Sequence, residues 1–231
     1  MLNKQNTVAF SHDFSDLRER FEMQRDSIEK YFEFLNSIVT NVKTFKILKS
    51  TVFLLLYNLV ESTVSNSLYL IHWSISEKNI RYDQLSHCLQ KSYMEYFLKN
   101  QGFKNVNEIQ KKKLIDFFDQ YFRLEKHIVQ FSYGNFVSIS GNIDNKKVNE
   151  IGEIYGFKMD RGRREEELLF VKEMRNSLGH GNISFSECSK DIVIGELFRI
   201  KNEVVGYLEC YLNTIENYIN ERRYLVCLDG E

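Results

Sequence analysis

One short string gathers the side chains of this sequence that are best suited to chemistry. Residues 175–181 read R-N-S-L-G-H-G and place a guanidinium, an amide and an imidazole where a helix is expected to end. Backbone carbonyls lack donors at such an end and carry partial negative charge, so a protonated His180 or Arg175 is stabilised there. An imidazole that holds its proton near neutral pH beside a permanent cation suffices to cut RNA without a metal ion. One group moves a proton at the 2′-hydroxyl or the leaving oxygen, and the guanidinium binds the charge that develops on phosphorus.

The spacing of these two residues limits what one chain can do. Arg175 and His180 are five residues apart, so they lie roughly 140° apart around an ideal helix and do not share one face. Either the helix distorts at Gly179, or a second copy of the chain completes the site. A symmetric dimer would place two histidines and two arginines around one phosphate. The spacing R-x-x-x-x-H alone is a weak signal, because it occurs by chance in many helical proteins.

Two further groups of charged residues are candidates for supporting roles. Glu61 stands in an otherwise apolar helix and needs a partner, either a structural hydrogen bond or ion pair, or Arg175, which it would orient. Arg161, Arg163 and Arg164 precede the motif helix. They would bind an RNA backbone if they lie on the same side as His180, and are solvated surface otherwise.

The usual signatures of metal and cofactor sites are missing from the sequence. It contains no G-x-x-x-x-G-K loop, no G-x-S-x-G, no H-E-x-x-H and no cysteine pair with metal-ligand spacing. We therefore expect neither a metal nor a cofactor, and any nucleotide hydrolysis would come from a partner protein.

Composition bounds the class of protein. The chain has 231 residues, 43% of them hydrophobic and 27% charged, which excludes disordered and fibrous classes. Its formal net charge of -1 means that a polyanion must be held by a local basic patch. Proline is absent and most of the eleven glycines fall between residues 134 and 181, so long helices are free to form on either side.

Apolar periodicity predicts one all-α helical bundle that forms a single domain over residues 1–231, with a core from about 15 to 225. An irregular insertion over about 132–160 precedes the motif helix and holds one short helix. A polar connection to about 190 follows that helix, and 224–228 is either a helix end or a brief strand. The expected helices cover 15–40, 43–76, 82–100, about 107–131, 144–155, 165 to about 179, and 191–221.

The sequence also predicts a cytoplasmic protein without membrane contact. The N-terminus never reaches the apolar region of a secretory signal, and the apolar segment 51–75 carries Glu61 at its centre, which suits a core helix better than a membrane span. The four cysteines have no metal-site spacing and are expected to be small buried thiols in a reducing compartment. They are Cys88, Cys188, Cys210 and Cys227.

The string at 175–181 resembles the R-N-x-x-x-H signature of the HEPN superfamily (higher eukaryotes and prokaryotes nucleotide-binding), whose members are small α-helical proteins that commonly dimerise. Further segments are similar to the MAE-type HEPN-like nuclease branch, and the similarity spans about residues 15–225. These segments are 51–63, 140–144, 155–157 and 215–224.

This resemblance implies a metal-independent endoribonuclease that is active as a homodimer, typical of phage defence, abortive infection or toxin–antitoxin loci. Arg175 and His180 match the family's catalytic pair, and Asn176 matches its polar residue beside the arginine. Some HEPN toxins continue the motif to a tyrosine that a partner nucleotidyltransferase modifies; Asn182 stands at that place, so this mode of silencing is not expected. Two alternatives stay open: a non-catalytic module that binds nucleotide, RNA or protein, and a subunit gated by an ATPase or antitoxin encoded nearby.

Overall fold

The computed structural model describes residues 13–103, 107–131, 136–137, 142–159 and 165–226. Within them lie eight α-helices and one 3₁₀ turn, η1, and no β-strand, only two isolated bridges. The predicted all-α class is confirmed. The bounds are α1 Phe14–Ser37, α2 Val42–Glu77, η1 Tyr82–Gln84, α3 His87–Asn100, α4 Glu108–Leu124, α5 Asn145–Tyr155, α6 Glu165–Gly179, α7 Phe185–Cys188 and α8 Ile194–Asn220.

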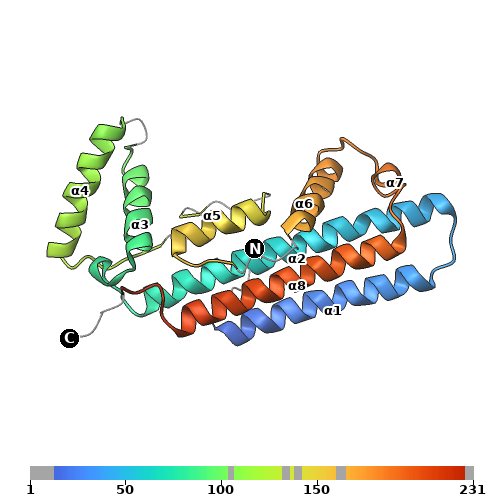
Figure 1. Ribbon diagram of the computed structural model, residues 1–231, viewed down its shortest axis with the longest axis horizontal. Coiled ribbons are helices and arrows are strands. Elements are labelled where there is room, and N and C mark those ends of the chain that lie inside the picture. The colour runs from blue at the N-terminus through green and yellow to red at the C-terminus, as the bar shows by residue number, and fades with distance from the viewer. Residues whose placement is uncertain (1–12, 104–106, 132–135, 138–141, 160–164, 227–231) are drawn as a thin grey trace, which may run out of the picture.

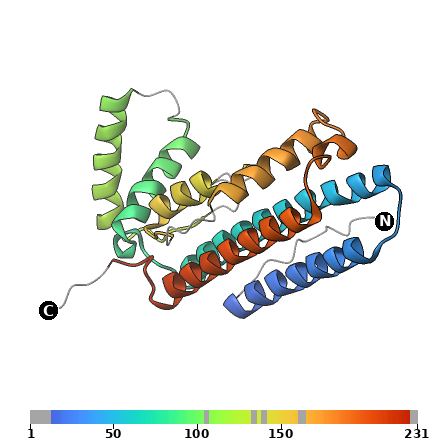
Figure 2. The same ribbon diagram turned by 45° about the vertical axis from the view of Figure 1, so that its right-hand side comes forward.

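Three long helices form the body of the molecule. Figures 1 and 2 both show α1, α2 and α8 running side by side, and each of the three contacts the other two. α6 and α7 pack on α2 near one end, α5 lies between α3 and α6, and the α3–α4 pair stands away from the body at the other end. This arrangement puts α2 at the centre, in contact with α1, α6, α7 and α8.

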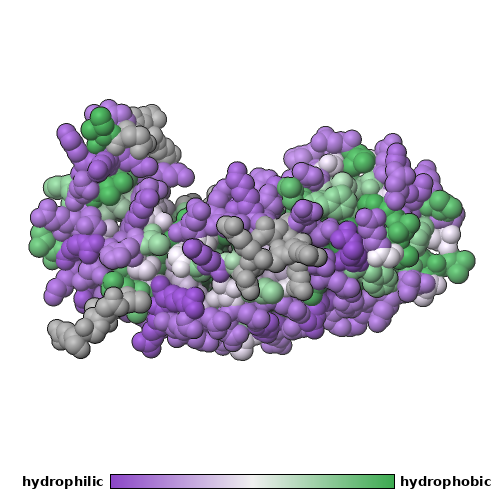
Figure 3. All heavy atoms as spheres, viewed as in Figure 1, coloured by the Kyte–Doolittle hydropathy of each residue, from purple (hydrophilic) through white to green (hydrophobic). Residues whose placement is uncertain are grey.

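Packing explains the apolar character of α2. It is the one helix among the described residues that is long and apolar enough to cross a membrane, and 56% of its most apolar window is buried inside the molecule. Its buried positions are spread around the whole circumference because neighbours cover it on several sides. The face seen in Figure 3 is mostly hydrophilic over the three-helix body, with hydrophobic side chains gathered towards its right-hand end. Its packing therefore identifies α2 as the core helix of the helical bundle.

Two predicted helix boundaries are wrong. The helix expected over 82–100 begins only at His87, because the Tyr82 backbone N–H donates to the His127 carbonyl at 2.7 Å and holds residues 82–84 in a 3₁₀ turn. The helix expected to reach about 131 ends at Leu124. Lys126 has φ +50°, and the His127 N–H then donates to the Phe122 carbonyl at 3.1 Å, which closes the helix.

Other connections also differ in detail from expectation. The polar connection after the motif helix contains α7, which is started by a capping box between Ser184 and Glu187. The described part of the C-terminal apolar run is neither helix nor strand, and Leu225 forms an isolated bridge with Leu85. The short helix predicted over 144–155 is confirmed as α5, with Asp144 as its N-cap.

The prediction of buried cysteines holds only for Cys188. Cys88 and Cys210 are exposed free thiols, and Cys227 lies outside the described residues. The reason is that both exposed cysteines stand on outer faces of their helices, while larger neighbours such as Leu89 and Tyr211 fill the inner faces.

Candidate functional site

The motif helix α6 ends as the glycines predict. The His180 N–H donates to the Asn176 carbonyl at 2.9 Å, so the α-helical hydrogen bonding continues without distortion to the C-cap. Gly181 then adopts φ +71°, and the Asn182 N–H donates to the Ser177 carbonyl at 2.9 Å, which is the bond that closes a Schellman motif. The helix is regular, so Arg175 and His180 keep their separation of roughly 140° around its axis.

His180 stands at the open end of this helix. Its side chain is exposed, and it has no hydrogen-bond partner within the part of the chain that the structure describes. A Cβ atom added at Gly179 or Gly181 would meet nothing within 4 Å. The imidazole is therefore accessible to a ligand or to another molecule.

Arg175 makes three contacts, two with α2 and one within its own helix. Its guanidinium carbon lies 4.5 Å from the centroid of the Tyr57 ring, and its Nη1 donates to Asn176 Oδ1 at 2.8 Å. Its Nη2 lies 3.9 Å from Glu61 Oε2. The Arg175 side chain is 31% exposed, so part of the guanidinium remains available to an anion while the rest is positioned.

Asn176 connects the arginine with the histidine. Its side-chain oxygen accepts from Arg175, and it precedes His180 by four residues, so the two lie one above the other on the same face of α6. The three motif residues thus follow one another around the end of the helix. Arg175 faces α2, while His180 faces outward, and Asn176 lies between them.

Arg175 is one partner of Glu61. The two side chains form a partly exposed ion pair across the α2–α6 interface. This contact fits both expected roles of Glu61, a structural ion pair and a group that orients the guanidinium. Tyr57 was not predicted as a site residue. It precedes Glu61 by one turn of α2, inside the segment 51–63 that carries the family resemblance, and this spacing is the only signal that could have indicated it.

Two residues just before α5, Ile143 and Asp144, contact Tyr57 and α6. The Tyr57 hydroxyl accepts from the Ile143 backbone N–H at 3.1 Å, and burial raises the pKa of this phenol. The next residue, Asp144, caps α5 and also forms an ion pair with Lys172, one turn before Asn176 on α6. Burial alone would raise the pKa of Asp144, but hydrogen bonds from Lys172 and the Lys147 N–H outweigh it and lower the pKa below its usual value.

A comparison with protein families decides the family of the chain. The model of the family described as HEPN_MAE_28990-like HEPN matches residues 14–224, from the start of α1 to beyond the end of α8. The chain belongs to this HEPN family. Searches of curated proteins and of solved structures returned no match. The resemblance found at the motif is confirmed, and for a HEPN protein it indicates a nuclease or another RNA-related function in the broad sense.

The segment that follows the HEPN motif is fastened to α2. The ammonium group of Lys49 donates to the carbonyls of Ser189, at 2.8 Å, and Ile192. The Ser50 hydroxyl donates to the Phe185 carbonyl at 2.5 Å. Lys49 is buried, and burial lowers its pKa. These bonds hold α7 in place, and α7 follows His180 by only a few residues.

The three arginines expected to bind an RNA backbone, Arg161, Arg163 and Arg164, lie outside the described residues. Tyr155 is completely buried and hydrogen-bonded to His72, so it belongs to the core of this HEPN domain. Phe136 packs beside them, with its ring 5.5 Å from that of His72. Among the described residues there is no group of three or more His, Cys, Asp or Glu side chains that could hold a metal ion.

Proposed function

We propose that this HEPN protein is a cytoplasmic endoribonuclease that cleaves RNA without a metal ion, at a site completed by a homodimer. The observation that carries this proposal is the end of α6. There a guanidinium held by Tyr57, Glu61 and Asn176 stands on the same helix as an exposed imidazole without a partner among the described residues. A positioned cation and a free general acid–base group are the two components that metal-independent transesterification needs.

The proposed reaction is attack by the ribose 2′-hydroxyl on the adjacent phosphorus. One imidazole removes the hydroxyl proton, the 2′-oxygen–phosphorus bond forms, and the bond to the 5′-oxygen breaks. An imidazole delivers a proton to that leaving oxygen, so the products are a 2′,3′-cyclic phosphate and a 5′-hydroxyl. Arg175 binds the charge on the equatorial phosphate oxygens, and Asn176 positions the phosphate between the arginine and His180.

A second copy of the chain is part of the proposal because Arg175 and His180 of one copy point in different directions from α6. Leu169, Asn176 and His180 lie within roughly 40° of one line along α6, since they are spaced by seven and four residues. Leu169 is an exposed apolar side chain, 42% accessible, and the C-terminal end of this stripe is open at Gly179 and Gly181. An exposed apolar residue about 16 Å along the same stripe of α6 from an accessible imidazole suits an interface between two copies.

Further parts of the proposal concern supporting residues and partners. Arg161, Arg163 and Arg164 would bind the RNA backbone next to the motif helix. A role in phage defence or in a toxin–antitoxin pair implies a restraining antitoxin or a gating ATPase. Such a partner is expected among the products of neighbouring genes.

Mixing two inactive variants tests the composite site. We expect Arg175→Ala and His180→Ala each to abolish cleavage of a single-stranded RNA in the presence of a chelator, and the mixed sample to regain activity after subunit exchange. A mixture as inactive as its components would contradict the shared site. Wild-type protein that shifts the RNA in a binding assay but leaves it intact would instead support the non-catalytic binding module.

A further inference from the structure

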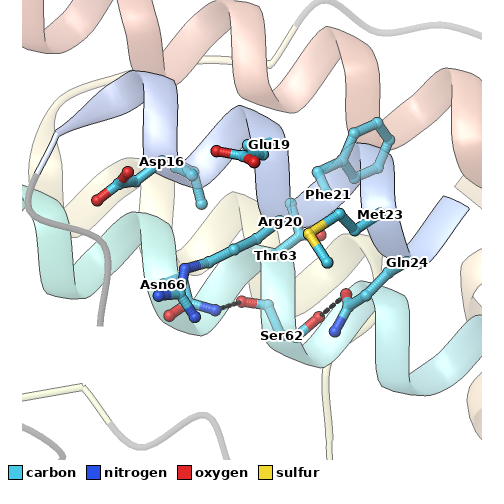
Figure 4. A pocket seen from close by; sticks show the side chains of 10 residues that line it. Asp16, Glu19, Arg20, Phe21, Met23, Gln24, Ser62, Thr63 and Asn66 are labelled. Atoms are coloured by element: carbon cyan, nitrogen blue, oxygen red, sulfur yellow. Dashed lines mark hydrogen bonds between the residues drawn. The ribbon is translucent and has the colours of Figure 1, made fainter. Parts of the chain in front are cut away.

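A second hollow lies between α1 and α2, away from the site described above. It has a volume of about 460 Å³, within the range of small-molecule sites, and its lining includes neither Glu61 nor Arg175. Leu17 and Phe21 of α1 are buried in its wall, and Met23 of the same helix is 64% exposed beside it. Figure 4 shows polar side chains from both helices converging on this hollow.

Arg20 is the cation among the residues that line this cavity, and its guanidinium has no ion-pair partner in the part of the chain that the structure describes. Two other arginines of α1 form ion pairs with α8, Arg18 with Glu216 at 3.5 Å and Arg25 with Glu209 at 3.2 Å. Within the described residues Arg20 forms no such pair, although Asp16 precedes it by one helical turn. Figure 4 shows its side chain extending from α1 towards Asn66 of α2. Its N–H groups are available to a ligand.

The second observation is a buried hydroxyl in the cavity wall that has no partner. Thr63 is 3% exposed, and its Oγ1 forms no hydrogen bond with any of the described residues. Buried polar atoms almost always have a hydrogen-bond partner, and one without a partner destabilises the folded state. Thr63 of α2 and Arg20 of α1 line the same hollow, so one bound molecule would provide a partner for both the hydroxyl and the guanidinium.

The remaining polar groups determine which kind of molecule fits. The Ser62 hydroxyl donates to Gln24 Oε1 at 2.6 Å, which leaves the Gln24 amide N–H groups as donors. Asn66 uses its own N–H to bond the Ser62 carbonyl at 2.8 Å. Guanidinium, amide and hydroxyl donors therefore outnumber the neutral acceptors that remain. This balance favours an oxyanion, while Leu17, Phe21 and Met23 offer apolar contact.

We propose that this cavity binds a small organic oxyanion, a carboxylate or a phosphomonoester on an apolar body. Arg20 takes two oxygens of the anion, and the hydroxyl of Thr63 and the amide of Gln24 donate to it. Asp16 and Glu19 also line the cavity, and Figure 4 shows their carboxylates pointing away from the Arg20 guanidinium. Their negative charge disfavours a polyanion such as an RNA backbone, so the site selects a single small anion. The proposal does not depend on RNA cleavage.

Thermal unfolding of the whole chain with benzoate, phenyl phosphate and inorganic phosphate tests this site. We expect benzoate or phenyl phosphate to raise the melting temperature by about 5–10 °C at one hundred times its Kd. The anion that gives the larger shift shows whether the cavity prefers a carboxylate or a phosphomonoester. Arg20→Gln should abolish the shift, and Arg18→Gln, the matched control, should keep it. No shift with either aromatic anion, an equal shift in Arg20→Gln, or an Arg20-dependent shift produced only by RNA would overturn the proposal.

The variant Thr63→Val separates a ligand-binding hydroxyl from a structural one. Valine has the same shape and removes the buried hydroxyl, so we expect the melting temperature without ligand to stay equal or rise and the ligand-induced shift to shrink. A lower melting temperature without ligand, together with an unchanged ligand-induced shift, would show that the hydroxyl serves the fold, and would overturn its assigned role.

Discussion

Arg175 packs face-on against Tyr57, with its guanidinium carbon 4.5 Å from the centre of the ring. The ring is completely buried, and its hydroxyl is fixed by the Ile143 backbone, so it is a rigid support. The pair with Glu61 is longer, at 3.9 Å, and about 30% exposed on both sides, so solvent screens it. The position of the proposed phosphate-binding group therefore depends on the ring more than on the carboxylate.

Two substitutions at Tyr57 distinguish the contribution of its ring from that of its hydroxyl. We expect Tyr57→Leu to lower the rate of RNA cleavage by roughly 10–100-fold, because the guanidinium loses its support, whereas Tyr57→Phe stays within about threefold of wild type. Both variants leave the Ile143 N–H unpaired, which costs about 1–3 kcal/mol of unfolding free energy. Cleavage rates of fully folded samples and urea unfolding measure the two effects. Equal losses of cleavage in both variants would show that the hydroxyl, rather than the ring, orients Arg175.

Glu61→Gln tests whether the carboxylate serves stability or orientation. The pair is partly exposed, so we expect its loss to change the free energy of unfolding by less than about 1 kcal/mol. Cleavage should nevertheless fall, by roughly tenfold, as Arg175 loses one of its three contacts. Glu209→Gln, which removes an ion pair with Arg25 on the far side of the bundle, is the control and should leave cleavage unchanged. A large fall in the melting temperature of Glu61→Gln would show a structural role instead.

Buried His72 should make the fold sensitive to mild acid. It lies among Phe131, Phe136 and Tyr155, and burial lowers its pKa from 6.5 to about 3. Between these two values the folded state binds fewer protons than the unfolded state, so stability decreases as the pH falls below 6.5. The slope is at most about 1.4 kcal/mol per pH unit, or about 2 kcal/mol between pH 7 and 5.

Urea unfolding of wild type and His72→Phe at pH 7, 6 and 5 measures this slope. The variant leaves the Tyr155 hydroxyl unpaired and should be less stable at pH 7, but it should lose less stability on acidification. His127, whose pKa burial also lowers, is present in both proteins and cancels in the comparison. Parallel losses of stability in the two proteins would mean that His72 is protonated in the folded state.

Lys49 should stabilise the docking of residues 185–192 on α2. Lys49→Met leaves the buried carbonyl of Ser189 and the partly buried carbonyl of Ile192 without their donor, so we expect a loss of about 2–4 kcal/mol in the free energy of unfolding. Amide hydrogen exchange should accelerate over residues 185–192. The exposed Lys43, substituted in the same way, should have an effect below about 0.5 kcal/mol. Unchanged exchange in Lys49→Met would assign the anchoring to two hydroxyl bonds, from Ser50 to the Phe185 carbonyl and from Ser189 to the Lys46 carbonyl at 2.7 Å.

The sequence predicts most of the fold because the signals for helices are local. Apolar periodicity and the missing prolines indicate the long helices, and Gly179 and Gly181 mark the end of α6 correctly. The early end of α4 escapes prediction because an ordinary residue, Lys126, adopts the left-handed conformation there. A tertiary bond from Tyr82 to His127 likewise overrides the start expected for α3.

The candidate site likewise contains residues that local sequence patterns predict and contacts that only tertiary packing creates. Arg175, Asn176 and His180 are visible as a motif on one helix, and an apolar helix with one carboxylate shows that Glu61 needs a partner. The contact between Tyr57 and Arg175 joins residues more than one hundred positions apart, and no local pattern announces it. The cavity between α1 and α2 is invisible for the same reason, because Arg20 and Thr63 meet only when the two helices pack.

Cleavage of a labelled RNA oligonucleotide in EDTA by the wild-type protein and by His180→Ala, with product ends identified by mass spectrometry, tests the proposed ribonuclease. We expect a 2′,3′-cyclic phosphate from the wild type and a rate at least about 100-fold lower for His180→Ala. The substrate should stay intact when the 2′-hydroxyl at the cleavage site is replaced by hydrogen. Undiminished cleavage by His180→Ala, or cleavage of the 2′-deoxy substrate, would contradict the proposed mechanism.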